Sequence, residues 1–325
     1  MADVVRIGVS RCLLGDQVRW DGGHKRDAYL VEVFGPQVTW VPVCPEVESG
    51  LPVPRPTLRL ERSPSGGVEV NGIRVRLIMP KSGGDWTDEM AEWAERRVKA
   101  LAAADLDGFV LKRDSPSCGL ERVKIYGGGS GVGERKGRGL FAEALVRALP
   151  NLPVEEEGRL TDPKLRENFI ERVFAHARLR QLFAGRWTVG DLVRFHTIHK
   201  MTLLAHQPTA YQRLGQLVAR AKAMPRLELR QAYTDGFMAA LAVIATPARH
   251  VNVMQHMLGH LRGLVDDDAR DEILRLVQEY RRGIVPIIVP LTLLHHYARR
   301  HAVQYLLGQS YLEPHPRELA LRNHV

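Results

Sequence analysis

The stretch VVRIGVSRCLLG, residues 4–15, decides how the first half of the chain folds. Its apolar run over residues 4–10 is typical of a buried strand, and this run ends just before Cys12. The same pattern recurs in VTWVPVCPE around Cys44 and in GFVLKRDSPSCG around Cys118. All three cysteines of the chain therefore follow a predicted strand closely.

Strands and helices alternate along the first half. The strands are predicted over residues 4–10, 38–43 and 108–112. The helices are predicted near residues 27–34, 87–104 and 140–149. This alternation is typical of a parallel sheet. We expect an α/β domain over residues 1–152, with a mostly parallel sheet in a Rossmann-like three-layer arrangement.

Three shorter features complete the first half. Asn71 and Gly72 form a turn pair that predicts a hairpin between residues 67–70 and 73–78. Thr87 is a suitable N-cap for the helix that follows it. Residues 127–139 are rich in glycine but lack a Gly-Lys-Ser/Thr ending, so we expect a loop and no nucleotide cofactor.

The second half has a different periodicity. Residues 150–165 are acidic and contain proline, which predicts a connector. Beyond it the apolar residues recur with a period near 3.6, which predicts an all-α domain over residues 165–325. The expected helices cover residues 165–183, 189–206, 209–223, 227–241, 248–265, 269–283 and 291–307.

Three cysteines in 325 residues do not suggest a disulfide framework. They could be unrelated buried thiols. Ligands of open α/β sheets, however, bind at the carboxyl ends of the strands, where all three would lie. Three soft thiolates could hold zinc or an iron–sulfur cluster. No close Cys-x-x-Cys pair supports structural zinc, and a [4Fe-4S] cluster on three cysteines would leave one iron without a protein ligand.

Charge separates the two halves. The net charge is +9, and residues 1–159 contain 23 basic and 23 acidic side chains, so the whole excess lies beyond them. This one-sided basicity indicates a polyanionic partner, with a solvated basic surface as the alternative.

Basic and aromatic residues in the second half are candidates for RNA contact, because cations bind phosphates and rings stack on unpaired bases. The basic candidates are Lys200, Arg249, Arg281, Arg282, Arg299, Arg300 and Arg322. The aromatic candidates, some of which belong to the core, are Tyr211, Tyr280, Tyr297, Tyr305 and Tyr311. Dimerisation and structural support are the alternatives for this half.

Histidines also cluster here, and the spacing of His196 and His199 suits a metal site on a helix face. Other histidines nearby in the sequence are His206, His295, His296 and His301. No His-Glu-x-x-His motif accompanies them, so hydrogen-bonded core or surface histidines are favoured.

No apolar run approaches the roughly 18 residues that a membrane span needs. The first residues lack a basic segment followed by an apolar one, so we expect no signal peptide and a cytoplasmic protein.

The motifs SRCLLG, CPE and SPSCG resemble those of the TudS thiouracil desulfidases and of their two-domain relatives, the RudS tRNA 4-thiouridine desulfidases. The second half resembles the helical domain of the RudS proteins in HVNVMQHMLG from His250, YRRGIVP from Tyr280 and ELALRNH from Glu318. The resemblance implies a [4Fe-4S] cluster held by Cys12, Cys44 and Cys118.

It also implies that Glu46 is the catalytic acid/base, assisted by Ser115 or by Ser117. The expected reaction converts 4-thiouridine in tRNA to uridine and releases sulfide, with the open iron as a Lewis acid. Free thiouracil or thionucleosides as substrates, or a non-enzymatic iron–sulfur sensor that binds nucleic acid, are the alternatives.

Arg11, Lys112 and Asp114 flank these motifs. The two cations could offset the charge of a cluster or contact a substrate phosphate, or be ordinary surface charges. The sequence does not indicate an oligomeric state.

Overall fold

The computed structural model describes residues 5–127 and 132–324. The chain divides into two compact units, Met1–Thr161 and Asp162–Val325. Each unit has its own core and is described separately.

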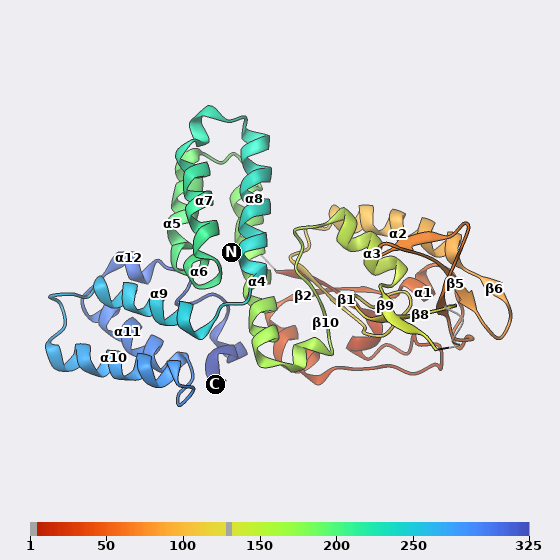
Figure 1. Ribbon diagram of the computed structural model, residues 1–325, viewed down its shortest axis with the longest axis horizontal. Helices are drawn as coiled ribbons and strands as arrows, with labels where there is room; N and C mark the ends of the chain where they lie inside the picture. Colours follow the sequence, from red (N-terminus) through yellow and green to blue (C-terminus); the bar gives the residue numbers. More distant parts are fainter. Residues whose placement is uncertain (1–4, 128–131, 325) are drawn as a thin grey trace. The chain divides into compact units, whose positions relative to one another are not determined.

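Sheet A of the first unit carries the cysteine motifs (Figure 1). Its strands are β1 (Arg6–Ser10), β2 (Thr39–Val43), β7 (Gly108–Leu111) and β10 (Val154–Glu156). They are all parallel, in the order β10-β7-β1-β2, which confirms the expected α/β class and parallel sheet. The Rossmann-like layering stays a prediction.

Strand β10 corrects the expectation of a connector over residues 150–165. Val154 pairs with Phe109, so this acidic segment extends sheet A. The acidic side chains of this segment have hydrogen-bond partners in the fold. Glu156 accepts a hydrogen bond from the backbone N–H of Leu120 at 2.7 Å, and Glu155 accepts one from Nε of Arg159 at 2.7 Å. These carboxylates are therefore structural.

Two long helices pack on the core of the first unit, α2 (Thr87–Ala102) and α3 (Leu140–Ala148). Trp93, Phe109 and Phe141 join them to the sheet through ring contacts of 5.5 and 5.6 Å. Shorter elements are the 3₁₀ helices η1 (Arg11–Leu14) and η3 (Gly35–Gln37), the π-helix η2 (Tyr29–Phe34) and α1 (Pro45–Glu48). The N-cap expected at Thr87 is wrong: Trp86 caps α2, and the Thr87 hydroxyl instead accepts the N–H of Leu77.

A second, mixed sheet was not predicted. Sheet B has the order β4-β5-β3-β8-β9, and β6 pairs with β5. Its strands are β3 (Arg59–Arg62), β4 (Val68–Val70), β5 (Ile73–Met79), β6 (Gly84–Asp85), β8 (Val123–Tyr126) and β9 (Glu134–Gly137). The expected hairpin is confirmed, with Asn71 and Gly72 both at positive φ. The expected loop over residues 127–139 is corrected in part by β9; residues 128–131 lie outside the described residues.

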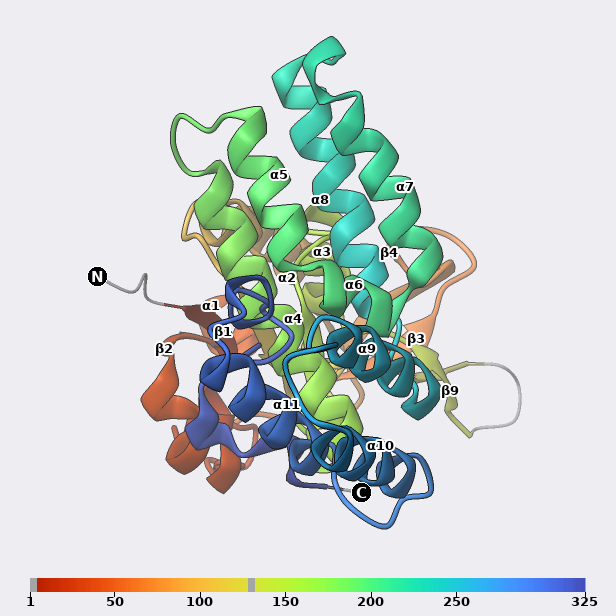
Figure 2. The ribbon, with the colours of Figure 1, turned by 90° about the vertical axis from the view of Figure 1, so that its left-hand side faces the viewer.

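The second unit is helical, as expected, and no strand occurs within residues 162–324 (Figure 2). Its helices are α4 (Pro163–Phe183), α5 (Val189–Ile198), α6 (Lys200–His206), α7 (Pro208–Ala219), α8 (Arg226–Ala242), α9 (Pro247–Gly259), α10 (Asp267–Arg281), α11 (Ile288–Arg300) and α12 (Gln304–Leu307). The helix expected over residues 189–206 is interrupted at His199, and the one expected over 291–307 is interrupted after Arg300.

No single helix in the described part of the chain is long and apolar enough to cross a membrane. The pair α8 and α9 passes such a test of length and composition only together, across a bend of 115°.

Candidate active site

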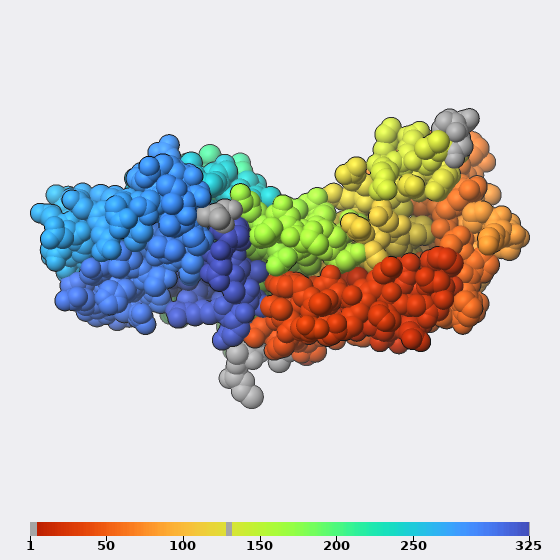
Figure 3. Space-filling model, turned by 90° about the horizontal axis from the view of Figure 1, so that it is seen from below, coloured from red at the N-terminus to blue at the C-terminus, as the bar shows by residue number. Residues whose placement is uncertain are grey.

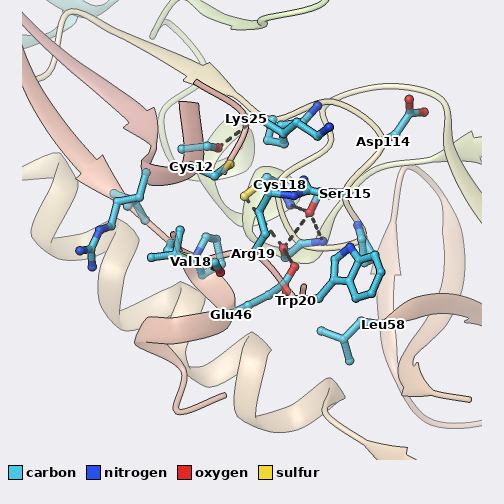
Figure 4. Close-up of a pocket in the computed structure, with 18 of the residues that line it drawn as sticks. Cys12, Val18, Arg19, Trp20, Lys25, Glu46, Leu58, Asp114, Ser115 and Cys118 are labelled. Carbon is cyan, nitrogen blue, oxygen red and sulfur yellow. Dashed lines mark hydrogen bonds between the residues drawn. The ribbon is translucent and has the colours of Figure 1, made fainter. Parts of the chain in front are cut away.

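The three cysteines line one pocket of about 380 Å³ in the first unit. Strands β7, β1 and β2 are neighbours in sheet A, so the segments that follow them meet at one sheet edge. Cys12 lies in η1 directly after β1, Cys44 follows β2, and Cys118 lies in the loop after β7. Figure 4 shows the side chains of Cys12 and Cys118 facing the same space. The convergence expected from the sequence is confirmed.

The loop that carries Cys118 is held by its own serine and by two glycines. The Ser115 hydroxyl accepts the backbone N–H groups of Ser117 at 3.3 Å and of Cys118 at 3.1 Å. A Cβ at Gly119 would lie 2.4 Å from the side chain of Val123, and one at Gly139 would lie 2.4 Å from the Ser117 carbonyl. Glycine is therefore required at both positions.

The backbones around the other two cysteines are also fixed. The N–H of Lys25 donates to the carbonyl of Cys12 at 2.9 Å. The N–H of Cys44 donates to the Glu48 carboxylate at 2.9 Å, and Arg97 lies 3.1 Å from that carboxylate. Figure 3 shows the N-terminal segment, in red, lying beside the yellow segment that follows β7 on one face of this unit.

Burial dominates the electrostatics of the thiols, which are 6–9% exposed and free of disulfides. It raises the pKa of Cys12 to about 11 and raises the pKa of Cys44 and of Cys118 as well. For each of the three thiols, the negative charge of neighbouring acidic groups raises the pKa further. The metal-free thiols are therefore protonated at neutral pH, and binding of a metal must release those protons.

Within residues 5–127 and 132–324, no group of three or more His, Cys, Asp or Glu side chains is placed to hold a metal ion. Ligands of one zinc ion each lie about 2.3 Å from it, which requires closely spaced sulfur atoms. An iron–sulfur cluster contains several metal atoms and spans a wider gap. Three buried thiols around one pocket fit such a cluster in number and in donor type.

Glu46 lies in the same pocket and has defined partners on both carboxylate oxygens. Arg55 donates to Oε2 from Nη2 at 2.6 Å and from Nε at 2.9 Å. Ser117 donates its hydroxyl to Oε1 at 2.8 Å, and the Ser115 and Ser117 oxygens lie 2.9 Å apart. Because the Ser117 proton points to Glu46, the Ser115 hydroxyl must donate to Ser117. The structure thus brings together all three predicted catalytic residues.

Arg55 is a site residue that sequence reasoning missed. Its side chain is 2% exposed and also donates to the carbonyls of Val18 and Pro52. The available signal was weak, a single arginine between the prolines of PVPRPT.

The charged residues that flank the motifs are already paired. Arg11 lies 2.7 Å from Asp16, whose hydrogen bond raises the Arg11 pKa. Lys112 pairs with Glu157, and Asp114 lies 3.0 Å from Arg135. All three flanking residues line the pocket, and a direct role for them stays a prediction.

In the helical unit the basic candidates differ in exposure. Arg281, Arg282, Arg299 and Arg300 are exposed. Lys200 is half-buried, with its Nζ 6.0 Å from the ring centres of both Tyr211 and Tyr305. Arg249 is half-buried and donates to the carbonyl of His206 at 2.5 Å, so it holds the backbone at the end of α6. Contact of Arg249 with RNA stays a prediction.

Two of the candidates for RNA contact are corrected. Arg322 is 4% exposed and donates to Glu167 at 3.2 Å and to the carbonyl of Tyr311 at 2.6 Å. Tyr311 is fully buried, and its hydroxyl oxygen lies 2.7 Å from Nδ1 of His250, its hydrogen-bond partner. A sequence cannot distinguish a buried arginine from an exposed one when its acidic partner lies 155 residues away.

The clustered histidines of α5, of α6 and of the break between these two helices are buried and hydrogen-bonded. His196 lies 3.1 Å from the Tyr233 hydroxyl, His199 donates to the carbonyl of Phe195 at 2.9 Å, and His206 lies 3.3 Å from Glu171. These contacts give each of them a structural role.

Comparison with known proteins divides the chain into two parts, one in each of the two structural units. A family model described as 2-thiouracil desulfurase matches residues 7–157. A second, described as a protein of unknown function, DUF1722, matches residues 200–316.

Among individual relatives, the uncharacterized protein YbgA of Escherichia coli (strain K12) is 33% identical over 48% of this chain and 94% of its own length. The uncharacterized protein YbbK of Bacillus subtilis (strain 168) is 29% identical over 43% of this chain and 89% of its own. A solved structure described as the [4Fe-4S]-dependent thiouracil desulfidase TudS is 32% identical, covers 50% of this chain and 96% of that chain, and gives a TM-score of 0.39. Through residues 7–157 the chain belongs to the 2-thiouracil desulfurase family, and residues 200–316 add a DUF1722 region to it.

Proposed function

We propose that this protein is a [4Fe-4S]-dependent desulfidase whose substrate is 4-thiouridine in tRNA. The observation that carries the proposal is the meeting of three buried thiols with Glu46, Ser117 and Arg55 in one pocket. Family membership supports carbon–sulfur bond cleavage. The related TudS structure supports the cluster, by its described dependence on one.

Cys12, Cys44 and Cys118 would hold the cluster. When bound, a cluster on three thiolates supplies an iron with an open position, a Lewis acid for the sulfur of the substrate. The overall reaction replaces the thiocarbonyl sulfur by the oxygen of water and releases hydrogen sulfide. It needs no electron donor or acceptor, because carbon keeps its oxidation state.

The chain's own residues manage the protons of this exchange. Attack by water on the ring carbon releases a proton, and the Ser115–Ser117–Glu46 series offers a route for it. Ser115 passes its proton to Ser117 and Ser117 passes its own to Glu46 Oε1, each over less than 3 Å. Arg55 holds Oε2, so the carboxylate keeps Oε1 directed at Ser117. Positioned groups of this kind accelerate reactions about 10²–10⁴-fold.

The tRNA substrate is supported by charge. The whole excess of nine positive charges lies beyond residue 159, and Arg281, Arg282, Arg299 and Arg300 are exposed. Contacts to phosphates supply most of the affinity for nucleic acid regardless of sequence. A free thiobase has no phosphate and would not use these side chains.

The test is anaerobic reconstitution with iron and sulfide, followed by incubation with tRNA containing 4-thiouridine. We expect released sulfide to equal the uridine found by nucleoside analysis. Free 4-thiouracil as the better substrate, or zinc in the active protein, would contradict the proposal. Glu46→Gln separates an enzyme, which should lose activity, from a sensor, which should keep its cluster and its RNA binding.

A further inference from the structure

Trp20 is a large aromatic side chain that lines the pocket and is nevertheless 44% exposed. Figure 4 shows its ring beside Leu58, across the pocket from the sulfur atoms of Cys12 and Cys118. Leu58 is half-buried and packs on the core of the first unit, so the ring lies beside a side chain that the core holds in place. A ligand that entered this pocket would pass between an aromatic wall and the thiols.

The wall is preorganised by a tight turn. The N–H of Gly22 donates to the Arg19 carbonyl at 3.0 Å, and the N–H of Arg19 donates to the Gly23 carbonyl at 3.2 Å. Gly22 has a φ of +76°, a conformation that favours glycine. The turn is also tied to the catalytic group, because the N–H of Arg55 donates to the Trp20 carbonyl at 2.9 Å. Arg55 thus holds both the backbone of Trp20, through its own N–H, and the Glu46 carboxylate, through its guanidinium group.

The cations around the pocket differ in one respect. Arg11, Arg19, Arg55, Lys112 and Arg113 all have carboxylate partners within 4 Å. Lys25 also lines the pocket, is exposed, and has no ion pair within the described residues. Its backbone N–H donates to the Cys12 carbonyl at 2.9 Å, so the lysine begins at the wall of the pocket. An unpaired, compact positive charge beside an aromatic wall complements a phosphate next to a base.

We infer that Trp20, backed by Leu58, is the wall on which the thiolated pyrimidine ring stacks, and that Lys25 contacts the phosphate attached to that nucleoside. The pocket therefore selects a nucleotide over a free base. This inference rests on the proposed desulfidase function and adds the residues that recognise the substrate. Stacking needs only a π-face, and the phosphate contact needs only charge, so the two residues have separable effects.

The first test uses the cluster-loaded, full-length protein with 4-thiouracil, 4-thiouridine and 4-thiouridine 5′-monophosphate. Trp20→Ala should raise KM at least about fivefold for all three, with kcat changed less than about twofold, and Trp20→Phe should restore most of the affinity. Lys25→Ala should raise KM about tenfold for the monophosphate alone, and Lys25→Arg should restore it. Arg26→Ala is the matched control, because Arg26 lies next to Lys25 but pairs with Glu32 and does not line the pocket.

The second test measures binding without turnover, by equilibrium dialysis of uridine 5′-monophosphate and uridine. Wild type should bind the monophosphate more tightly, and Lys25→Ala should abolish that preference while Trp20→Ala weakens both. Equal effects of Lys25→Ala on both ligands, or unchanged binding in Trp20→Ala, would overturn the inference. Failure of the proposed function has a different signature: no sulfide is released by wild type, while these binding differences can still be measured.

Discussion

Arg55 holds one carboxylate oxygen of Glu46 with two of its nitrogens, at 2.6 and 2.9 Å, from a position that is almost fully buried. This leaves the other oxygen, Oε1, to the Ser117 hydroxyl. Arg55 therefore determines which oxygen of the Glu46 carboxylate is available to exchange a proton with Ser117.

Arg55→Met should lower kcat about 100-fold and destabilise the first unit by about 3 kcal/mol, because it leaves a largely buried carboxylate without its partner. Arg55→Lys keeps the positive charge but loses the two-nitrogen contact of the guanidinium fork. It should recover part of kcat and part of the stability. Urea unfolding followed by tryptophan fluorescence suits the test, since four of the five tryptophans, all but Trp187, lie in the first unit. Wild-type activity in Arg55→Lys would show that orientation by the fork is unimportant.

Ser117→Ala and Ser115→Ala should fail in different ways. Ser117→Ala removes the donor to Glu46 and should lower kcat by about 10²-fold or more while iron content is kept. Ser115→Ala also removes the acceptor for the Cys118 N–H, so it should lower iron content as well as kcat. Ser49→Ala is the control, because that hydroxyl donates only to the backbone carbonyl of Glu46. The readouts are iron per chain and kcat, measured on the same preparations.

Alanine at Cys12, Cys44 or Cys118 should abolish both the brown colour of the reconstituted protein and its activity. Wild type should hold about four iron atoms per chain, the content of a [4Fe-4S] cluster. Absorbance near 400 nm and iron analysis check this. A variant that kept a full complement of iron would show that the missing cysteine is not a ligand.

In the helical unit, the pair of His206 and Glu171 predicts a pH-dependent contribution to stability. The carboxylate raises the pKa of His206 above its usual 6.5, and His206 lowers the pKa of Glu171, against the opposing effect of burial on both. The His206 contribution is complete below pH 6.5 and is lost as pH rises through its folded pKa, while that of Glu171 is lost in acid.

His206→Gln should therefore cost most between about pH 4.5 and 6.5, and less at higher pH. Burial lowers the pKa of His199 to about 3, so this histidine destabilises the fold in acid, opposite to His206. Because the His199 contribution is common to variant and wild type, the quantity to measure is the difference between their free energies of unfolding. Helix unfolding followed by circular dichroism gives this difference. A cost that is constant with pH would mean that the pKa of His206 is the same in the folded and the unfolded protein.

Alanine at Arg281, Arg282, Arg299 and Arg300 should weaken tRNA binding at low salt. Each phosphate contact that is lost should reduce the slope of log K against log salt concentration by about one. Arg96→Ala is the control, since Arg96 is an exposed arginine of the first unit. Filter binding over a range of salt concentrations measures the slope, and an unchanged slope in the quadruple variant would place the RNA contacts elsewhere.

Most of sheet A and the helices of the second unit could be predicted from the sequence, because buried strands and amphipathic helices leave periodic patterns. Strand β10 was hidden because Glu155 and Glu156 bond to groups that only the fold brings near. Sheet B was missed except for its hairpin, since β3 and β8 are short and charged and pair across 65 residues.

The cysteines and Glu46 were predictable because they directly follow strands and belong to recognisable motifs. Arg55 and Trp20 were not, because neither follows a strand and their importance comes from groups that only the folded pocket brings near them. For the same reason Arg322 and Tyr311 were among the candidates for RNA contact, whereas Glu167, Glu171 and His250 surround them in the core.

The arrangement of β7, β1 and β2 as neighbours has a consequence for how the protein matures. Each strand delivers one cysteine, and the third arrives only when residues about 100 positions apart in the chain have paired, as Ile7 does with Gly108. Non-local pairing of this kind is slow to form. A chain in which β7 has not yet joined the sheet thus offers iron at most two of the three thiols. A cluster held by all three would therefore be inserted last, a checkpoint that only a completed sheet can pass.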